Sequence, residues 1–187
     1  MLRTKGLTYA YQDKELLFPD LALKPGDKAV IRGKSGSGKT TLLHILGGLL
    51  KPMAGEVEID KVSLPELPKS ELEKWRKQNV GLVLQQPIFP KYLTFKEHVA
   101  LLLKHKGIKE NHMTELAEEL GVAQKLNSLP GTLSGGERQR MALLNALIHK
   151  PSVLLIDEAT ANLDDENASA LLQLIFNHIP PEGYVLM

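Results

Sequence analysis

A glycine-rich segment at residues 33–40 constrains the fold of this chain more than any other feature. It reads Gly-Lys-Ser-Gly-Ser-Gly-Lys-Thr and fits the pattern G-x-x-x-x-G-K-[ST] at every position. Residues 28–31 before it, of which the last three are apolar, are typical of a short strand, and after Lys39 apolar residues recur at helical spacing. Because strand, loop and helix in this order form a unit of parallel sheets, the segment predicts an α/β fold.

The residue types in this loop suit a phosphate ligand. Its glycines let backbone N–H groups point into one concavity, and the start of the following helix adds partial positive charge. Lys39 supplies a cation for the β- and γ-phosphates, and the Thr40 hydroxyl suits Mg²⁺. The loop alone indicates only a nucleoside triphosphate site, because several enzyme classes share it. The predicted nucleotide-binding residues are Gly33, Lys34, Ser35, Gly36, Ser37, Gly38, Lys39, Thr40 and Thr41.

Two carboxylates follow a buried-type strand at residues 153–156. Ligands of open α/β sheets bind at the carboxyl ends of strands. Asp157 therefore suits a Mg²⁺ site, and Glu158 suits a general base that polarises an attacking water. Two solvated acids after a core strand would look the same, but the phosphate loop in the same chain favours the functional interpretation.

A second anion-binding pattern lies at residues 133–140, which read Leu-Ser-Gly-Gly-Glu-Arg-Gln-Arg. Ser134, Gly135 and Gly136 precede a predicted helix, so they offer amides and a hydroxyl at a helix N-terminus. An ordinary N-cap explains the same residues. Because one nucleotide does not need two such devices from one domain, the pattern also suggests a second protomer.

Together these motifs resemble the nucleotide-binding domain of ABC transporters, over essentially the whole chain. The resemblance implies a P-loop NTPase core with a parallel sheet, an N-terminal antiparallel β-subdomain and an inserted α-helical subdomain. It implies a single domain, in which residues 1–85 and 147–187 form the nucleotide-binding core with the β-subdomain. Residues 86–146 would form the helical subdomain that carries the signature motif.

The resemblance also implies roles for isolated residues. Gln85 matches a glutamine that binds Mg²⁺, takes part in catalysis and senses the membrane partner. Tyr11 matches the aromatic residue that stacks on adenine, although Tyr9 is a competitor and an ordinary strand tyrosine is an alternative. Asp164 matches an aspartate that contacts the opposite protomer.

The family model implies a head-to-tail homodimer, or a pair with another ABC ATPase domain, around two Mg-ATP. Ser134, Gly135 and Gly136 of one copy would contact the γ-phosphate bound by the other. Hydrolysis would drive a separate integral membrane subunit, with this chain cytoplasmic and peripheral on the inner face of the cell membrane. The motifs look similar to the lipoprotein-release, macrolide or peptide-export and cell-division group. Alternatives are a non-transport ABC ATPase and a hydrolysis-impaired nucleotide-binding module.

One family residue has no match. The switch histidine is expected just after the strand that begins at Tyr184, and the sequence ends at Met187. His178 precedes that strand, so it is not assigned the role. We therefore expect a C-terminal truncation, and slower ATP hydrolysis than in a version extended through the missing histidine.

Composition excludes several other function classes. The chain has no cysteine, which excludes disulfides and thiolate chemistry. Lys plus Arg number 23 and Asp plus Glu 22, so a basic surface for nucleic acid is not expected. The longest fairly apolar stretch, residues 42–50, is too short to cross a bilayer, which needs about 20 apolar residues.

Overall fold

The computed structural model describes residues 1–11, 14–108, 112–157 and 165–187 of the chain. The strands are β1 Leu2–Tyr11, β2 Lys14–Leu17, β3 Ala22–Leu23, β4 Lys28–Ala29, β5 Ala54–Ile59, β6 Val62–Ser63, β7 Val80–Val83, β8 Val153–Ile156 and β9 Tyr184–Leu186. The α-helices are α1 Lys39–Leu46, α2 Lys69–Asn79, α3 Phe95–Lys106, α4 Met113–Glu119, α5 Gly135–Leu147 and α6 Asp165–His178. Short 3-10 turns lie at Leu64–Glu66, Ala123–Lys125 and Pro130–Thr132.

The central sheet is parallel, with the strand order β4-β9-β8-β7. β7 and β8 are adjacent, with Val83 opposite Ile156, although helices α3, α4 and α5 separate them in the sequence. The Asp157 N–H extends this pairing by donating to the Val83 carbonyl at 2.9 Å. The prediction of an α/β fold with a parallel sheet is therefore confirmed, and the helical run interrupts the sequence between two neighbouring strands.

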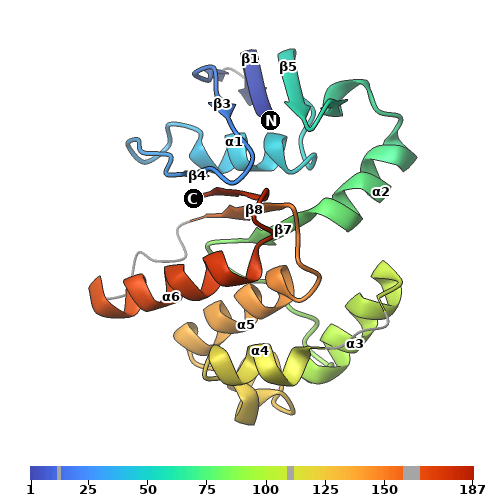
Figure 1. Cartoon of the computed structure of the whole chain (residues 1–187), viewed down its shortest axis with the longest axis vertical. Helices are drawn as coiled ribbons and strands as arrows, with labels where there is room; N and C mark the ends of the chain where they lie inside the picture. The colour runs from blue at the N-terminus through green and yellow to red at the C-terminus, as the bar shows by residue number, and fades with distance from the viewer. Residues whose placement is uncertain (12–13, 109–111, 158–164) are drawn as a thin grey trace.

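A second sheet is antiparallel and has the order β2-β1-β5-β6, with β3 also pairing with β1. In Figure 1, α1 lies between this sheet and the parallel one, whereas α5 and α6 lie on the other side of the parallel sheet. The N-terminal antiparallel strands implied by the family resemblance are thus present. The division of the chain at residues 85 and 146 stays a prediction.

The parallel sheet separates two hydrophobic cores because its side chains alternate between faces. Leu154 and Ile156 point into a core shared with helices α3 to α6. Val153 and Leu155 point into a core shared with α1 and the antiparallel sheet. All four side chains are at most 2% exposed, and fully burying one aliphatic side chain contributes about 1.5–3 kcal/mol. Hydrophobic packing therefore stabilises the parallel sheet on both faces.

The elements differ from the sequence predictions mainly at their ends. The bounds Val153–Ile156 agree with the prediction. The strand expected at residues 28–31 covers only Lys28–Ala29. Gly135 and Gly136, expected to precede a helix, form the first turn of α5 instead, because Ser134 caps it. Within the described residues, the helices are too short or too polar for any of them to span a bilayer.

Candidate functional site

The phosphate loop joins β4 to α1 and contains two glycines with left-handed backbone angles. Gly36 has φ +74° and Gly38 has φ +95°, a region that glycine adopts without steric cost. Gly38 is the N-cap residue of α1, and no side chain caps this helix end. The first turn of α1, which is fully described, contains no acidic residue. The helix therefore begins with positive partial charge that its own side chains do not neutralise.

The Lys39 side chain folds back along this loop. Its Nζ donates to the Gly33 carbonyl at 3.0 Å and to the Lys34 carbonyl at 3.4 Å. A Cβ at Gly33 would come within 2.6 Å of Ser37 Oγ, so a larger residue there would require the Ser37 side chain to move. The lysine cation thus lies against the same backbone that a phosphate would contact.

The strongest long-range link at the site joins Thr40 to Asp157. The Thr40 hydroxyl donates to Asp157 Oδ2 at 2.7 Å, across 117 residues of sequence. Asp157 is only 6% exposed. A hydroxyl and a carboxylate are the hard oxygen donors that Mg²⁺ prefers, so these residues fit that ion. The described residues hold no group of three or more His, Cys, Asp or Glu suited to a metal, so phosphate and water would complete the six ligands.

Gln85 follows the end of β7, the strand next to β8. Because Val83 pairs with Ile156, Gln85 and Asp157 leave the sheet from the same carboxyl edge. The Gln85 side chain is exposed. The sheet pairing thus brings the predicted glutamine to the edge where Thr40 and Asp157 meet.

The two competing tyrosines have different environments. Tyr9 packs against the core between α1 and the antiparallel sheet. Tyr11 is 50% exposed, and its hydroxyl accepts a hydrogen bond from Thr41 Oγ1 at 3.4 Å. The rings meet edge to face with centroids 4.9 Å apart. Tyr11 is therefore the tyrosine that offers a free ring surface beside α1.

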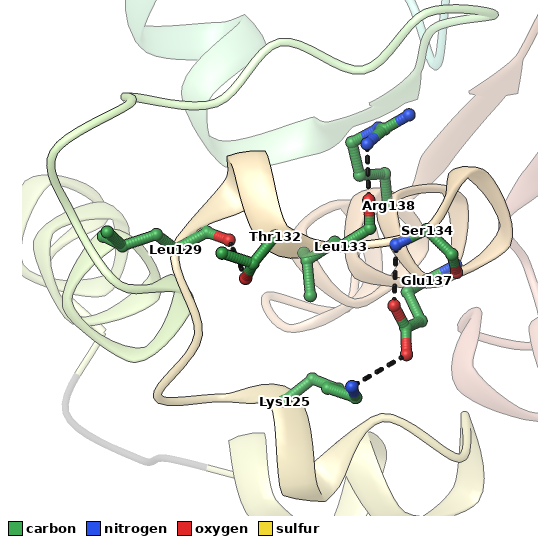
Figure 2. A network of polar contacts seen from close by, with 7 residues as sticks. All are labelled: Lys125, Leu129, Thr132, Leu133, Ser134, Glu137 and Arg138. Carbon is green, nitrogen blue, oxygen red and sulfur yellow. Dashed lines mark hydrogen bonds and ion pairs between the residues drawn. The ribbon is translucent and has the colours of Figure 1, made fainter.

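The signature segment forms a capping box at the start of α5. The Ser134 N–H donates to Glu137 Oε2 at 2.7 Å, and the Glu137 N–H donates to Ser134 Oγ at 3.2 Å. Figure 2 shows Glu137 bridging between Ser134 and Lys125, whose Nζ lies 3.3 Å from Glu137 Oε1. Hydrogen bonds from the Ser134 backbone, then from its side chain, hold the pKa of Glu137 below its usual value. The ordinary N-cap interpretation of Ser134 is thus correct for the single chain.

The glycines after Ser134 face open space. A Cβ at Gly135 would meet nothing within 4 Å, and Gly135 and Gly136 are both exposed. Arg138 anchors the turn by donating to the Leu133 carbonyl at 2.5 Å (Figure 2). The capping box and this contact order the segment while leaving its glycine surface accessible.

Three further residues considered in the sequence are Glu158, Asp164 and His178. Glu158 and Asp164 lie outside the described residues. His178 ends α6, with Nδ1 3.0 Å from the Leu174 carbonyl and Nε2 3.5 Å from Glu119 of α4. It therefore contacts helices on the far side of the sheet from the phosphate loop.

Sequence reasoning missed two contributors to the site. Glu137 was not assigned a role, although Ser134 followed by a glutamate three residues later is a capping-box pattern. Lys14, whose Nζ donates to the Gly36 carbonyl at 2.9 Å, carried no motif beyond its position three residues after Tyr11.

Comparison with known proteins identifies the family to which this site belongs. Residues 19–161 match the family model described as "ABC transporter". The chain belongs to the ABC transporter family. It is an ATP-binding subunit of the family and an ATPase, with motifs in the family's order around a P-loop NTPase core.

Curated relatives support this assignment. The lipoprotein-releasing system ATP-binding protein LolD of Idiomarina loihiensis is 39% identical over 185 residues, covering 94% of this chain and 81% of the relative. LolD of Buchnera aphidicola is 40% identical over 160 residues, covering 83% of this chain and 70% of the relative. The putative hemin import ATP-binding protein HrtA of Staphylococcus haemolyticus is 34% identical over 180 residues, covering 89% of this chain and 76% of the relative. The lipoprotein-release resemblance is therefore confirmed.

Solved structures agree with these relatives. The dimeric structure of MJ0796, a bacterial ABC transporter cassette, superposes with a TM-score of 0.89 at 32% identity. The match covers all of this chain and 87% of that one. A dimeric post-hydrolysis state of MJ0796 bound to ADP and Pi has a TM-score of 0.87.

Proposed function

We propose that this ABC ATPase binds Mg-ATP at the phosphate loop and pairs head to tail with a second ABC ATPase domain. ATP binding closes the pair and hydrolysis opens it. The cycle drives a separate integral membrane subunit, and the chain works as a peripheral subunit on the inner face of the cell membrane. The membrane subunit selects the cargo, in keeping with relatives named for lipoprotein release and for hemin import.

The hydrogen bond between Thr40 and Asp157 is the observation that carries this proposal. It joins the start of α1, where phosphate binds, to the carboxyl end of β8. Thr40, Asp157 and Gln85 are the residues that would hold Mg²⁺ there. The ion would supply positive charge to the oxygens of the β- and γ-phosphates. Both motifs of a phosphoryl-transfer site therefore meet at one edge of the sheet.

Lys39 and the loop amides bind the phosphates, and Tyr11 stacks on the adenine. Glu158 follows Asp157 directly and takes the proton from the attacking water. Gln85 orients that water and signals the state of the site to the membrane subunit.

A second copy completes the site through the signature segment. Ser134, Gly135 and Gly136 are exposed and lie at the N-terminus of α5, so the Gly135 and Gly136 N–H groups, the Ser134 hydroxyl and the positive partial charge of the helix end face a γ-phosphate. Asp164 of the same copy contacts the opposite protomer. The dimeric structures of MJ0796, one of them bound to ADP and Pi, support this arrangement.

The Glu158→Gln variant tests the proposed cycle. It keeps the phosphate loop and the Thr40–Asp157 pair but removes the base, so hydrolysis should fall by about 10²–10⁴-fold. Size-exclusion chromatography in Mg-ATP should show more dimer than for the wild-type chain, because bound ATP is not consumed. Wild-type turnover by Glu158→Gln would show that Glu158 is not the base.

The matched control is Lys39→Ala. It removes a charge-assisted contact to phosphate, so affinity for Mg-ATP should fall by about 10²-fold and the ATP-dependent dimer should disappear. A Lys39→Ala chain that still dimerises in ATP would contradict the proposed role of the nucleotide between the two copies.

A further inference from the structure

The β1–β2 hairpin lies against the phosphate loop. At the end of β1, Tyr11 accepts a hydrogen bond from Thr41 of α1. At the start of β2, Lys14 Nζ donates to the Gly36 carbonyl at 2.9 Å. Further along, Leu16 and Phe18 lie so near Gly38 that a Cβ there would come within 3.1 and 3.0 Å of them. The hairpin thus contacts the loop and the start of α1 through polar and apolar groups.

The Lys14 contact restrains one particular peptide group of the loop. The Ser37 N–H donates to the Lys34 carbonyl at 3.1 Å, inside the loop itself. In a trans peptide the carbonyl points the opposite way from the N–H, and here that Gly36 carbonyl meets Lys14. The peptide between residues 36 and 37 is therefore held from both sides.

This restraint matters because Gly36 has little conformational preference of its own. Its φ is +74°, and a Cβ there would meet nothing within 4 Å, so residue 36 has no side chain and no side-chain packing that would fix the orientation of this peptide. Rotation of the peptide would exchange the directions of its carbonyl oxygen and its N–H. A carbonyl oxygen turned toward a phosphate would repel it, whereas N–H groups attract it.

We propose that Lys14 is a positioning residue of the phosphate loop, which acts through the Gly36 carbonyl to keep the loop in its phosphate-binding conformation. The inference rests on the proposed function, because it takes the loop to be the nucleotide site. Lys14 is exposed and reaches the loop from another sheet, so its loss leaves both hydrophobic cores intact.

Nucleotide binding by Lys14→Met in the 187-residue chain tests the inference. The probes are fluorescent ATP and ADP analogues in Mg²⁺. A charged hydrogen bond to a carbonyl at an exposed site predicts a loss of about fivefold in affinity, equal for the two nucleotides. KM for ATP should rise by the same factor with kcat unchanged. Lys14→Arg keeps a cationic donor and should recover affinity to within about twofold.

Lys5→Met is the matched control. It removes an equally exposed lysine from β1, with the same change in net charge, away from the loop. Its affinity should equal that of the wild type. The melting temperatures of all variants without nucleotide should agree, and the nucleotide-induced rise should be smaller for Lys14→Met alone.

Three results would contradict either the proposed nucleotide site or the positioning role of Lys14. If the wild-type chain binds neither analogue, the proposed function fails. If the wild type binds and Lys14→Met binds equally well, the positioning role fails. If Lys14→Met loses affinity for ATP but not for ADP, Lys14 contacts the γ-phosphate directly, and its action through Gly36 is wrong.

Discussion

Helices α1 and α5 both begin at a glycine-rich turn, but their first turns are stabilised in opposite ways. At α1 the N-cap is Gly38, in a left-handed conformation and without a side-chain cap. At α5 the N-cap is Ser134, and its capping box with Glu137 satisfies the Ser134 and Glu137 amides within the chain. A ligand can therefore add more stabilisation at α1 than at α5.

The difference matches two distinct tasks in the proposed cycle. The turn before α1 must bind phosphate tightly in one chain, so no side chain caps the helix that follows it. The turn before α5 must keep its shape until a second copy brings a nucleotide to it, so it is stabilised internally. The exposed glycines there leave room for that approach.

Gly38→Ala, at the start of α1, should cause the largest loss of folding stability. Alanine is the better helix former, yet the left-handed φ of +95° costs it about 1–2 kcal/mol of stability. The contacts with Phe18 and Leu16 add to that cost. Urea unfolding should show this loss. Gly107→Ala, at φ +73° with no atom near its Cβ, should lose less, and equal losses would show that the hairpin contact is unimportant.

Ser134→Ala, which removes the N-cap of α5, should cause the next largest loss of folding stability. Loss of a serine N-cap costs about 1 kcal/mol, which urea unfolding measures. Nucleotide affinity of the single chain should not change, but ATP-dependent dimerisation should weaken. Thr94→Ala removes the capping box at the start of α3 and should cost similar stability without affecting the dimer.

Ser134→Asp separates the two roles of this serine. Aspartate is also a good N-cap, so stability should be kept, whereas its negative charge should repel the γ-phosphate of the second copy. If Ser134→Asp still dimerises in ATP, the signature segment does not contact the phosphate.

The smallest effect is a pH dependence confined to α5. Glu137 has a lowered pKa in the folded chain, so the unfolded chain binds a proton more readily. Its contribution to stability is thus present above the ordinary value of 4.5 and is lost as pH falls below it. Glu137→Gln should lack this part of the acid dependence when the two unfolding curves are compared between pH 6 and 3. Identical pH dependence would mean that the Glu137 carboxylate does not stabilise the helix start.

The phosphate loop and the capping boxes of α3 and α5 depend on neighbours in sequence, so patterns of a few residues could predict them. Helix α3 shows such local signals at both ends, because Thr94 and Glu97 begin it and Gly107 ends it. The Asp157 carboxylate was predictable as a strand-end acid, since four apolar residues precede it. Strand β4 was overextended in the prediction, because apolar residues also occur in the loop that leaves the sheet.

Sequence patterns could not predict the contacts between residues that lie far apart in the chain. The pairing of β7 with β8 brings Gln85 and Asp157 to one edge, although the helical insert separates the two strands in sequence. The choice of Tyr11 over Tyr9 depended on which ring the core covers. The contact of Lys14 with Gly36 needed the antiparallel sheet to dock on the loop.

The sequence by itself determined that this protein binds nucleoside triphosphate, and its separated motifs indicated the ABC family, because those residues act through local backbone geometry. The tertiary structure alone decided which side chains share the site. Thr40 meets Asp157 and Lys14 meets Gly36 because two sheets pack on the two sides of α1, and such packing depends on the burial of both cores at once.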